Sequence, residues 1–346
     1  MSEIRDRKND HLTLCAEGDV EHRGTTLLEQ VHLLHDAIPD RSLDEIDLAV
    51  ELFGRKLQAP ILISSMTGGT PEAQEINHAL ATVAQKCGFA MGVGSQRAML
   101  LHPELTDTYR IRDTAPDIPL LANIGSVQAR DEDSESITEM IRSIGADALC
   151  IHLNVAQELT QSEGDRDFRG CLGAIEALVD ELDVPVIVKE TGCGLSPGVI
   201  GRLAACGIDW IDVAGAGGTS WTGVEALRGP ESQQALGRAL RDWGIPTAAS
   251  VAYGTRAGLH TIASGGIRTG RDIANALALG ADIAGLALPF LRAYTRGGDA
   301  ELLAVATQLI EELRAITLLC GVPRASDLRQ VPRVLGRELE SWLELS

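Results

Sequence analysis

The chain has 346 residues, a formal net charge of −19, 45% hydrophobic residues and only 3% aromatic residues. This length exceeds one small core but suits a single (β/α)8 barrel with extensions. The charge argues against a general nucleic-acid or anionic-membrane surface, although it permits a small anionic ligand where basic residues gather. Seven cysteines without a CxxC pair, and no long apolar run or secretory signal, favour a cytoplasmic protein with reduced thiols and no membrane span.

Residues 1–58 show no repeating pattern, and we interpret them as an N-terminal extension that contributes to the substrate site. They include the basic stretch RDRKNDHL at 5–12. The segment LDEIDLAVELFG at 43–54 alternates apolar and acidic residues, which predicts a half-exposed strand or hairpin.

From residue 59 onward, apolar β-type runs alternate with segments of helical spacing. The predicted strands are 61–64, 90–93, 119–123, 148–153, 185–189, 210–213, 260–264 and 283–287. The predicted helices are 71–87, 134–144, 171–182, 197–206, 231–252 and 270–279, followed by a C-terminal helix at 299–320. Thr70-Pro71 and the Thr269–Asp272 spacing are helix-start signals.

Eight nearly continuous apolar strands with helical crossovers indicate a parallel sheet whose outer face is covered. An open doubly wound sheet would usually carry GxGxxG after its first strand, and none occurs there. We therefore predict an α/β protein, a (β/α)8 TIM barrel at 59–346 with an N-terminal extension and a C-terminal helix, forming one domain overall.

The fourth predicted strand ends in a burst of polar side chains. His152, Asn154, Gln157 and Glu158 follow one another within seven residues. Polar groups at the carboxyl end of a barrel strand are typical of an active site. Glu158 is the best metal candidate, because Mg²⁺ takes one or two carboxylates together with ligand phosphates, although a helix-surface carboxylate would look the same.

The acidic tail that follows this strand is a separate feature. We expect it to form a solvated loop, paired with itself, that carries no chemistry. Its charged residues are Glu163, Asp165, Asp167 and Arg169.

The seventh strand is followed by SGGIRTG and then a helix. Backbone N–H groups at the positive end of that helix would form an anion site, and Arg268 would add a charged contact. The glycines alone would equally suit tight turns. When this loop is considered together with GAGGT after the sixth strand and with the eighth loop, we favour an anion site.

Lys189 ends the apolar run PVIVKE, where a lysine is rarely left without a partner. It would face the electron-rich edge of a flavin or form a Schiff base; a salt bridge with Glu190 or Glu158 is the structural alternative. Arg97 and the pair Arg7-Lys8 are candidates to bind a second anionic group. A solvated, frayed N-terminus would also explain the charges of Arg7-Lys8.

These motifs occur together in one order: RKNDHL, SSMTGG, GVGSQR, ANIGS, HLN with AQE and QSEGDRDF, VKETGCGLS, DVAGAGGTSW and ASGGIRTG. The chain thereby resembles the type II isopentenyl-diphosphate isomerases, which are FMN-dependent (β/α)8 barrels. The matching pieces run from residue 7 to about residue 290. Each motif is weak alone, whereas generic flavin barrels lack RKNDHL, SQR and NVAQE.

The resemblance implies reversible 1,3-allylic isomerisation of isopentenyl diphosphate to dimethylallyl diphosphate, in isoprenoid biosynthesis. It also implies FMN that is reduced by NADPH, Mg²⁺ on the diphosphate, and a homo-tetramer or homo-octamer. The implied FMN contacts are Ser65, Met66, Thr67, Ser95, Asn123, Lys189, Thr219, Gly265, Gly266, Arg268, Ala287 and Leu288. The implied substrate contacts are Arg7, Lys8, Ser95, Gln96, Arg97 and Gln157, with Gln157, His152 and Asn154 as catalytic candidates and Glu158 as the metal ligand.

Because a carboxylic acid protonates an unactivated alkene poorly, we hypothesise that reduced FMN acts as the acid and base while Gln157 orients the substrate. One alternative is an FMN-dependent oxidoreductase of the α-hydroxy-acid dehydrogenase type. That chemistry needs a histidine base near the seventh strand, but His260 stands at the start of the strand. A non-catalytic phosphate-ligand binding protein is a further alternative, which would leave Lys189, Gln157 and Glu158 unexplained.

Overall fold

The computed structural model describes residues 2–344, with side chains described from Lys8 onward. Its centre is a closed barrel of parallel strands in the order β10-β11-β4-β5-β6-β7-β8-β9. The bounds are β4 (Ile61–Ile63), β5 (Ala90–Gly92), β6 (Leu120–Gly125), β7 (Ala148–Leu153), β8 (Val186–Glu190), β9 (Trp210–Asp212), β10 (His260–Ala263) and β11 (Ile283–Leu286). Each predicted apolar run forms one of these strands, so the (β/α)8 prediction is confirmed.

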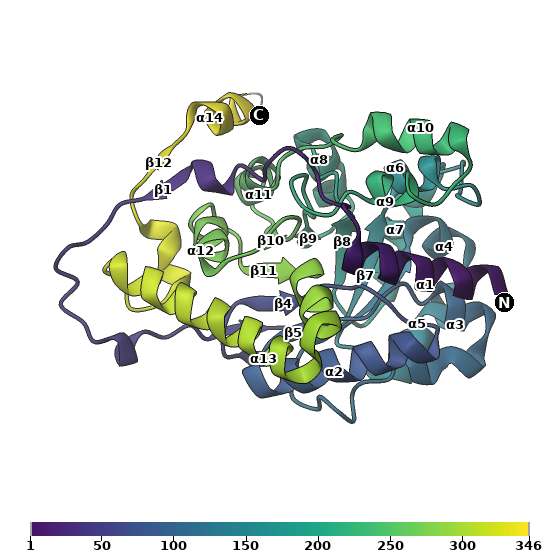
Figure 1. Cartoon of the computed structure of the whole chain (residues 1–346), viewed down its shortest axis with the longest axis horizontal. Coiled ribbons are helices and arrows are strands. Elements are labelled where there is room, and N and C mark those ends of the chain that lie inside the picture. Colours follow the sequence, from purple (N-terminus) through teal and green to yellow (C-terminus); the bar gives the residue numbers. More distant parts are fainter. Residues whose placement is uncertain (1, 345–346) are drawn as a thin grey trace.

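The helices surround the barrel (Figure 1) and bury apolar side chains against it. They include α2 (Pro71–Cys87), α4 (Ser126–Asp131), α5 (Ser134–Ile144), α7 (Cys171–Glu181), α8 (Pro197–Ala205), α11 (Thr247–Arg256), α12 (Gly270–Ala278) and α13 (Leu288–Leu319). Two predicted helix starts are confirmed: Thr70 accepts from the Ala73 N–H at 3.1 Å, and Thr269 forms a capping box with Asp272.

One predicted helix was wrong. The predicted helix 231–252 is two helices, α10 (Glu231–Leu240) and α11, separated by a turn at Gly244 and Pro246. Proline lacks an N–H and disfavours a helical residue before it, so the helix cannot continue through this point. Helix α13 also holds a helix before Gly297 that was not predicted; Gly297 and Gly298 have non-helical backbone angles and separate it from the C-terminal helix predicted from residue 299.

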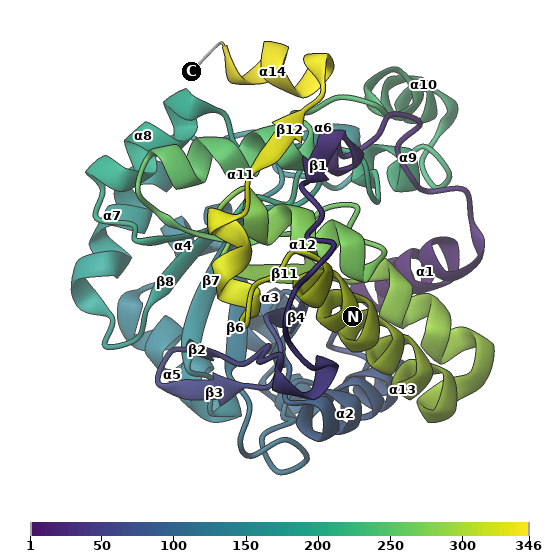
Figure 2. The same ribbon diagram turned by 90° about the vertical axis from the view of Figure 1, so that its left-hand side faces the viewer.

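The N-terminal extension runs along the whole barrel (Figures 1 and 2). Helix α1 (Ser2–Glu17) lies at the end of the barrel where the strand-end loops are, beside the short helices of those loops. Strand β1 (Val31–Leu33) pairs with β12 (Arg333–Leu335), and the hairpin of β2 (Val50–Leu52) and β3 (Arg55–Leu57) lies at the opposite end. The remaining elements are η1 (Leu28–Gln30), η2 (Leu43–Glu45), α3 (Arg97–Leu101), η3 (Pro103–Thr108), α6 (Val155–Thr160), α9 (Trp221–Glu225), η4 (Ala325–Gln330) and α14 (Arg337–Leu343).

The hairpin predicted for residues 43–54 therefore forms, as β2 and β3, at the C-terminal end of that segment. Helix α1 had no counterpart in the predicted elements. Over the described part of the chain, no helix combines the length and the apolar character that a bilayer-spanning helix requires.

Candidate active site

A cavity of about 830 Å³ opens at the carboxyl ends of the barrel strands. Its volume is within the usual range for small-molecule sites. The following sequence-predicted residues line it: Lys8, Ser65, Met66, Thr67, Ser95, Arg97, Asn123, His152, Asn154, Gln157, Glu158, Lys189, Thr219, Gly265, Gly266, Arg268, Ala287 and Leu288. Residues predicted from separate loops are thus brought to one cavity, while the side chain of Arg7 lies outside the described residues.

Gln96 does not line this cavity, in contrast to the substrate contact expected for it. Its fully buried side chain accepts a hydrogen bond from the Asn123 N–H at 2.9 Å and donates to the Met99 sulfur at 3.1 Å. Gln96 immediately precedes helix α3, which turns its side chain toward the end of β6. In this structure it supports the backbone of Asn123.

His152, at the end of β7, is held as a neutral imidazole. Burial and the nearby charge of Lys189 lower the pKa of His152 to about 4. The Asn123 amide donates to the Val93 carbonyl at 3.1 Å, so its oxygen accepts from His152 Nδ1 at 2.8 Å. This hydrogen-bond network assigns the proton to Nδ1, and Nε2 is left as an acceptor.

Lys189 forms a buried ion pair with Asp212, a residue that sequence reasoning missed. Lys189 Nζ lies 2.9 Å from Asp212 Oδ2, and the side chains are 9% and 2% exposed. Ser264 donates to the other carboxylate oxygen at 2.5 Å. The predicted salt bridge thus exists with a different partner, because β8 and β9 are adjacent and Lys189 is in register with Asp212. The position of Asp212 at the end of an apolar strand was the available signal.

Glu190 organises the loop after β8. One of its carboxylate oxygens accepts from the backbone N–H groups of Thr191, Gly192 and Cys193, at 2.6, 2.7 and 2.5 Å. Burial nevertheless raises the pKa of Glu190 to about 7, although these N–H groups and Lys189 act in the opposite direction. Thr191 and Gly192 line the cavity, so this carboxylate fixes part of the cavity wall.

The loop after β7 continues directly into helix α6 and presents its polar residues along the cavity. Asn154 donates to Glu158 Oε1 at 2.7 Å, and the Asp165 N–H donates to Glu158 Oε2 at 2.7 Å. A carboxylate has about four lone-pair sites, so Glu158 keeps acceptor capacity toward the cavity. Among the described residues, no group of three or more His, Cys, Asp or Glu side chains could hold a metal by itself.

The acidic tail is more than a solvated loop that pairs with itself. Asp167 and Arg169 do pair with each other at the surface, as expected. Asp165, however, lies 3.7 Å from Arg97, and Glu163 lies 3.8 Å from Arg228. The loop therefore supplies carboxylates to cations at the cavity, which its internal charge pattern did not reveal.

Helix α1 brings two basic side chains to the other side of the opening. Lys8 Nζ donates to the Gly68 carbonyl and, at 2.8 Å, to the Tyr109 hydroxyl. His11, one helical turn farther along, lies 2.8 Å from Glu225. Their spacing of three residues was the signal for His11, because such residues share one face of a helix.

Glu225 is a second functional candidate that the sequence did not single out. Burial opposes its ionisation, but the hydrogen bond from His11 and the charge of Arg228 hold the pKa of Glu225 below its ordinary value. Arg228 lies 2.9 Å from it. A carboxylate, an imidazole and a guanidinium thus meet beside the cavity, between α1 and α9.

The predicted anion site differs in detail from the expectation. The backbone N–H groups of Arg268 and Thr269 are taken by Asp272, and that of Gly270 by Glu312, so the start of α12 is already satisfied. The glycines at 265 and 266 have φ of 92° and 81°, which favour glycine, and both line the cavity. Helix α13 begins at Leu288 on the same cavity, so its N-terminal end faces the site.

His260 lies away from the cavity. It begins β10 at the opposite end of the barrel, where it stacks on Trp210 with ring centroids 4.5 Å apart and lies 3.3 Å from Asp282. The histidines that line the cavity are His11 and His152. This placement agrees with the expectation that His260 stands at the wrong end of its strand to act as a base.

Comparison with known proteins gives a consistent picture. A family model described as FMN-dependent dehydrogenase matches residues 155–333. The chain is 46% identical to the isopentenyl-diphosphate delta-isomerase of Halobacterium salinarum, over 99% of this chain and 97% of that protein. It is 50% identical to that of Synechococcus sp., over 91% of this chain and 92% of that protein.

Among solved structures, a mandelate oxidase mutant with a monooxide FMN adduct is similar with a TM-score of 0.64 and 18% identity. The match covers 94% of this chain and 99% of that chain. At this identity the likeness supports the barrel fold and not a shared reaction.

Replacing Asp212 by Asn should lower the free energy of unfolding by about 3–5 kcal/mol, because Lys189 would keep a buried charge without its partner. Urea unfolding measures this loss. The matched control is Asp107→Asn, which breaks an exposed pair with Arg110 and should cost at most about 1 kcal/mol. Equal losses in the two variants would contradict the prediction, and adding Lys189→Met to Asp212→Asn should restore part of the stability.

Glu190 should make stability fall as pH rises. Its pKa of about 7 exceeds the ordinary 4.5, so between pH 4.5 and pH 7 the folded chain keeps a proton on Glu190 that the unfolded chain has released. At about 1.4 kcal/mol per pH unit, the contribution present below pH 4.5 and lost by pH 7 is roughly 3 kcal/mol. Glu190→Gln keeps an acceptor but cannot titrate. Its free energy of unfolding relative to the parent should therefore rise across this window, and a constant difference would exclude the assignment.

Proposed function

The chain belongs to the family of isopentenyl-diphosphate delta-isomerases, and from that premise we propose that it converts isopentenyl diphosphate reversibly into dimethylallyl diphosphate. The observation that carries this proposal is one cavity with two separate regions suited to anions. Lys8 and Arg97 lie near the first and second strand-end loops, and Gly266 and Arg268 lie on the seventh. Two phosphorylated ligands, a cofactor and a substrate, would account for both regions.

FMN is the cofactor that we propose for the cavity, and the residues present fit it. Lys189 lines the wall as a cation that can face an electron-rich ring edge, and the hydroxyl of Ser64 is buried there without a hydrogen-bond partner among the described residues. The proposed FMN contacts are Ser65, Met66, Thr67, Ser95, Asn123, Lys189, Thr219, Gly265, Gly266, Arg268, Ala287 and Leu288. When bound and reduced, with NADPH as the proposed reductant, FMN supplies proton transfer and an electron-rich face beside the substrate.

The chain's own polar residues would hold and orient the substrate. Lys8, Ser95, Arg97 and Gln157, together with Arg7 of the same helix, are the proposed contacts. Three further groups would fix the position of the substrate: the acceptor Nε2 of neutral His152 and the amides of Asn154 and Gln157. We assign them orientation and not proton transfer, because none is an acid strong enough to protonate an alkene unaided.

Mg²⁺ is the metal proposed for the diphosphate, with Glu158 as its protein ligand. One carboxylate suits this ion, which usually keeps waters and takes ligand phosphates. Asn154 and the backbone of Asp165 would hold Glu158 in place. We also propose, from the family resemblance, a cytoplasmic homo-tetramer or homo-octamer.

No structural observation favours the dehydrogenase alternative. A hydroxy-acid dehydrogenase would need a histidine base at the end of β10, whereas His260 starts that strand at the far end of the barrel. A binding protein without catalysis would not require the buried Lys189–Asp212 pair or Glu158 at the cavity.

The central experiment is an absorption spectrum of the purified protein, followed by an anaerobic assay with isopentenyl diphosphate, NADPH and Mg²⁺. We expect a flavin spectrum, formation of dimethylallyl diphosphate only after reduction, and loss of turnover with EDTA that Mg²⁺ restores. Flavin reduction by a 2-hydroxy acid without NADPH would instead support the dehydrogenase. A colourless protein that cannot be reconstituted with FMN would overturn the proposal.

Arg97→Ala should mainly raise the substrate concentration needed for half-saturation. Loss of one charged hydrogen bond corresponds to about 1.5–3 kcal/mol, or roughly 10- to 150-fold in kcat/KM. Arg110→Ala is the matched control, because Arg110 is an exposed arginine paired with Asp107 outside the cavity. Kinetics of Arg97→Ala equal to those of this control would remove Arg97 from the site.

A further inference from the structure

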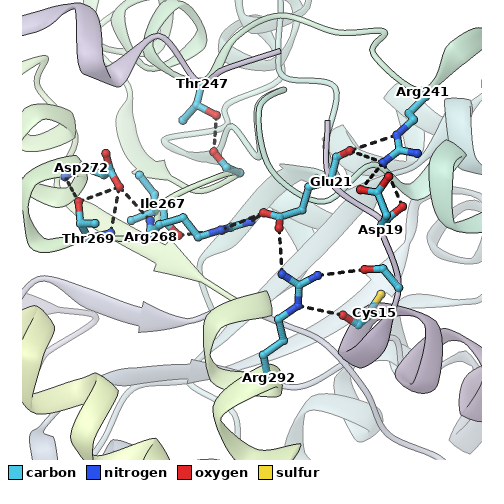
Figure 3. A network of polar contacts seen from close by, with 12 residues as sticks. Cys15, Asp19, Glu21, Arg241, Thr247, Ile267, Arg268, Thr269, Asp272 and Arg292 are labelled. Carbon is cyan, nitrogen blue, oxygen red and sulfur yellow. Dashed lines mark hydrogen bonds and ion pairs between the residues drawn. The ribbon is translucent and has the colours of Figure 1, made fainter. Parts of the chain in front are cut away.

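Arg292 on helix α13 holds the C-terminal end of helix α1 (Figure 3). Its guanidinium donates to the Cys15 carbonyl at 3.4 Å and to the Gly18 carbonyl at 3.1 Å. The last carbonyls of a helix lack intrahelical donors and carry partial negative charge, so a cation is favourable there. Arg292 is therefore a C-terminal anchor for α1.

Glu21 lies between this anchor and the seventh strand-end loop. One carboxylate oxygen is 2.5 Å from Arg268 Nη2, and the other is 2.9 Å from Arg292 Nη1 (Figure 3). Burial raises the pKa of Glu21, but the two arginines outweigh burial and hold the pKa below its ordinary value. Glu21 is thus a carboxylate that joins a cation of the seventh strand-end loop to a cation of helix α13.

The backbone around Glu21 is fixed as well. The His22 N–H donates to the Gly218 carbonyl at 2.8 Å, and the Ser220 N–H donates to the Val20 carbonyl at 2.8 Å. Arg241 Nη2 donates to the Glu21 carbonyl at 2.9 Å. The segment after α1 therefore runs beside the sixth loop, with an isolated antiparallel β-bridge between Glu21 and Thr219, and Glu21 has little freedom to leave its two arginines.

The two ends of α1 have different tasks. Its C-terminal end is anchored by Arg292, and about two turns earlier Lys8 and His11 contact the cavity loops and Glu225. A shift of the anchored end would move both basic side chains together, because a helix moves as a rigid rod over this length. The Arg268–Glu21–Arg292 contacts thus determine where Lys8 lies.

We propose that Glu21 and Arg292 are positioning residues that fix helix α1 over the cavity and so place Lys8 and His11 for the substrate diphosphate. The substrate part rests on the proposed function. Glu21 acts on α1 through Arg292, and its other partner is Arg268, a proposed FMN contact that the removal of Glu21 would leave free for the cofactor. Its loss therefore weakens substrate binding without weakening cofactor binding.

The test compares Glu21→Gln, Arg292→Gln and the double variant with the FMN-loaded parent protein. Glu17→Gln is the matched control, since it removes one negative charge from an exposed position of the same helix. We expect Glu21→Gln to raise KM for isopentenyl diphosphate about tenfold, with kcat within about twofold. The double variant should be no worse than Arg292→Gln alone, because the two residues act as one unit.

Two further measurements separate positioning from a general structural role. The FMN dissociation constant of Glu21→Gln should stay the same or fall, and the urea midpoint should match that of the control. Brief trypsin treatment should cleave after Lys8 faster in Glu21→Gln than in the parent, with the new N-terminus identified by mass spectrometry.

An unchanged KM and unchanged cleavage after Lys8 would overturn the proposal, as would weakened FMN binding, which would assign Glu21 to the cofactor site. If the parent protein has no isomerase activity, the proposed function fails. The cleavage rates would still decide whether Glu21 fixes α1.

Discussion

A positive charge at the wall of a barrel is stable only where oxygen atoms with negative charge lie beside it. In this chain, three of the cations proposed for anionic ligands already have such partners. Lys189 has Asp212, Arg97 has Asp165, and Arg268 has Glu21. These carboxylates come from other segments of the chain, so the cations also hold the segments around the cavity together. A phosphate that enters must therefore share or replace an existing acceptor.

The fold was largely predictable because each barrel strand is a short apolar run followed by a break. A barrel strand is buried on both faces, so its sequence is a continuous apolar run without alternating polar residues. The errors arose where one residue overrides a periodic pattern. Pro246 prevents the single helix that the spacing alone predicts for residues 231–252, and the non-helical Gly297 and Gly298 separate an unpredicted first part of α13 from the predicted C-terminal helix. Helix α1 could not be foreseen, since its stability depends on Arg292 and Lys8 contacts with distant loops.

The site was predictable as far as it depends on strand ends, because parallel strands in a closed barrel bring those ends to one face. His152, Lys189 and Arg268 were found this way. Asp212 was hidden by its apolar neighbours, and its pairing follows from register between adjacent strands. Glu21 and Arg292 are 271 positions apart, and no local pattern connects them. Gln96 shows the converse: its place in a motif suggested a ligand contact, but its side chain turns into the barrel wall.

The barrel shared with FMN-dependent oxidases does not by itself decide between removing a hydride and moving a proton. The side chains at the strand ends must decide. A hydroxy-acid oxidation needs a base that takes a proton from the substrate, and His260 at the far end of the barrel cannot serve. His152 is neutral and tethered to Asn123, while Glu158 is held by Asn154 and Asp165. Among the described residues, the cavity wall offers no strong acid, and this agrees with the proposed reaction, in which the cofactor would carry the proton.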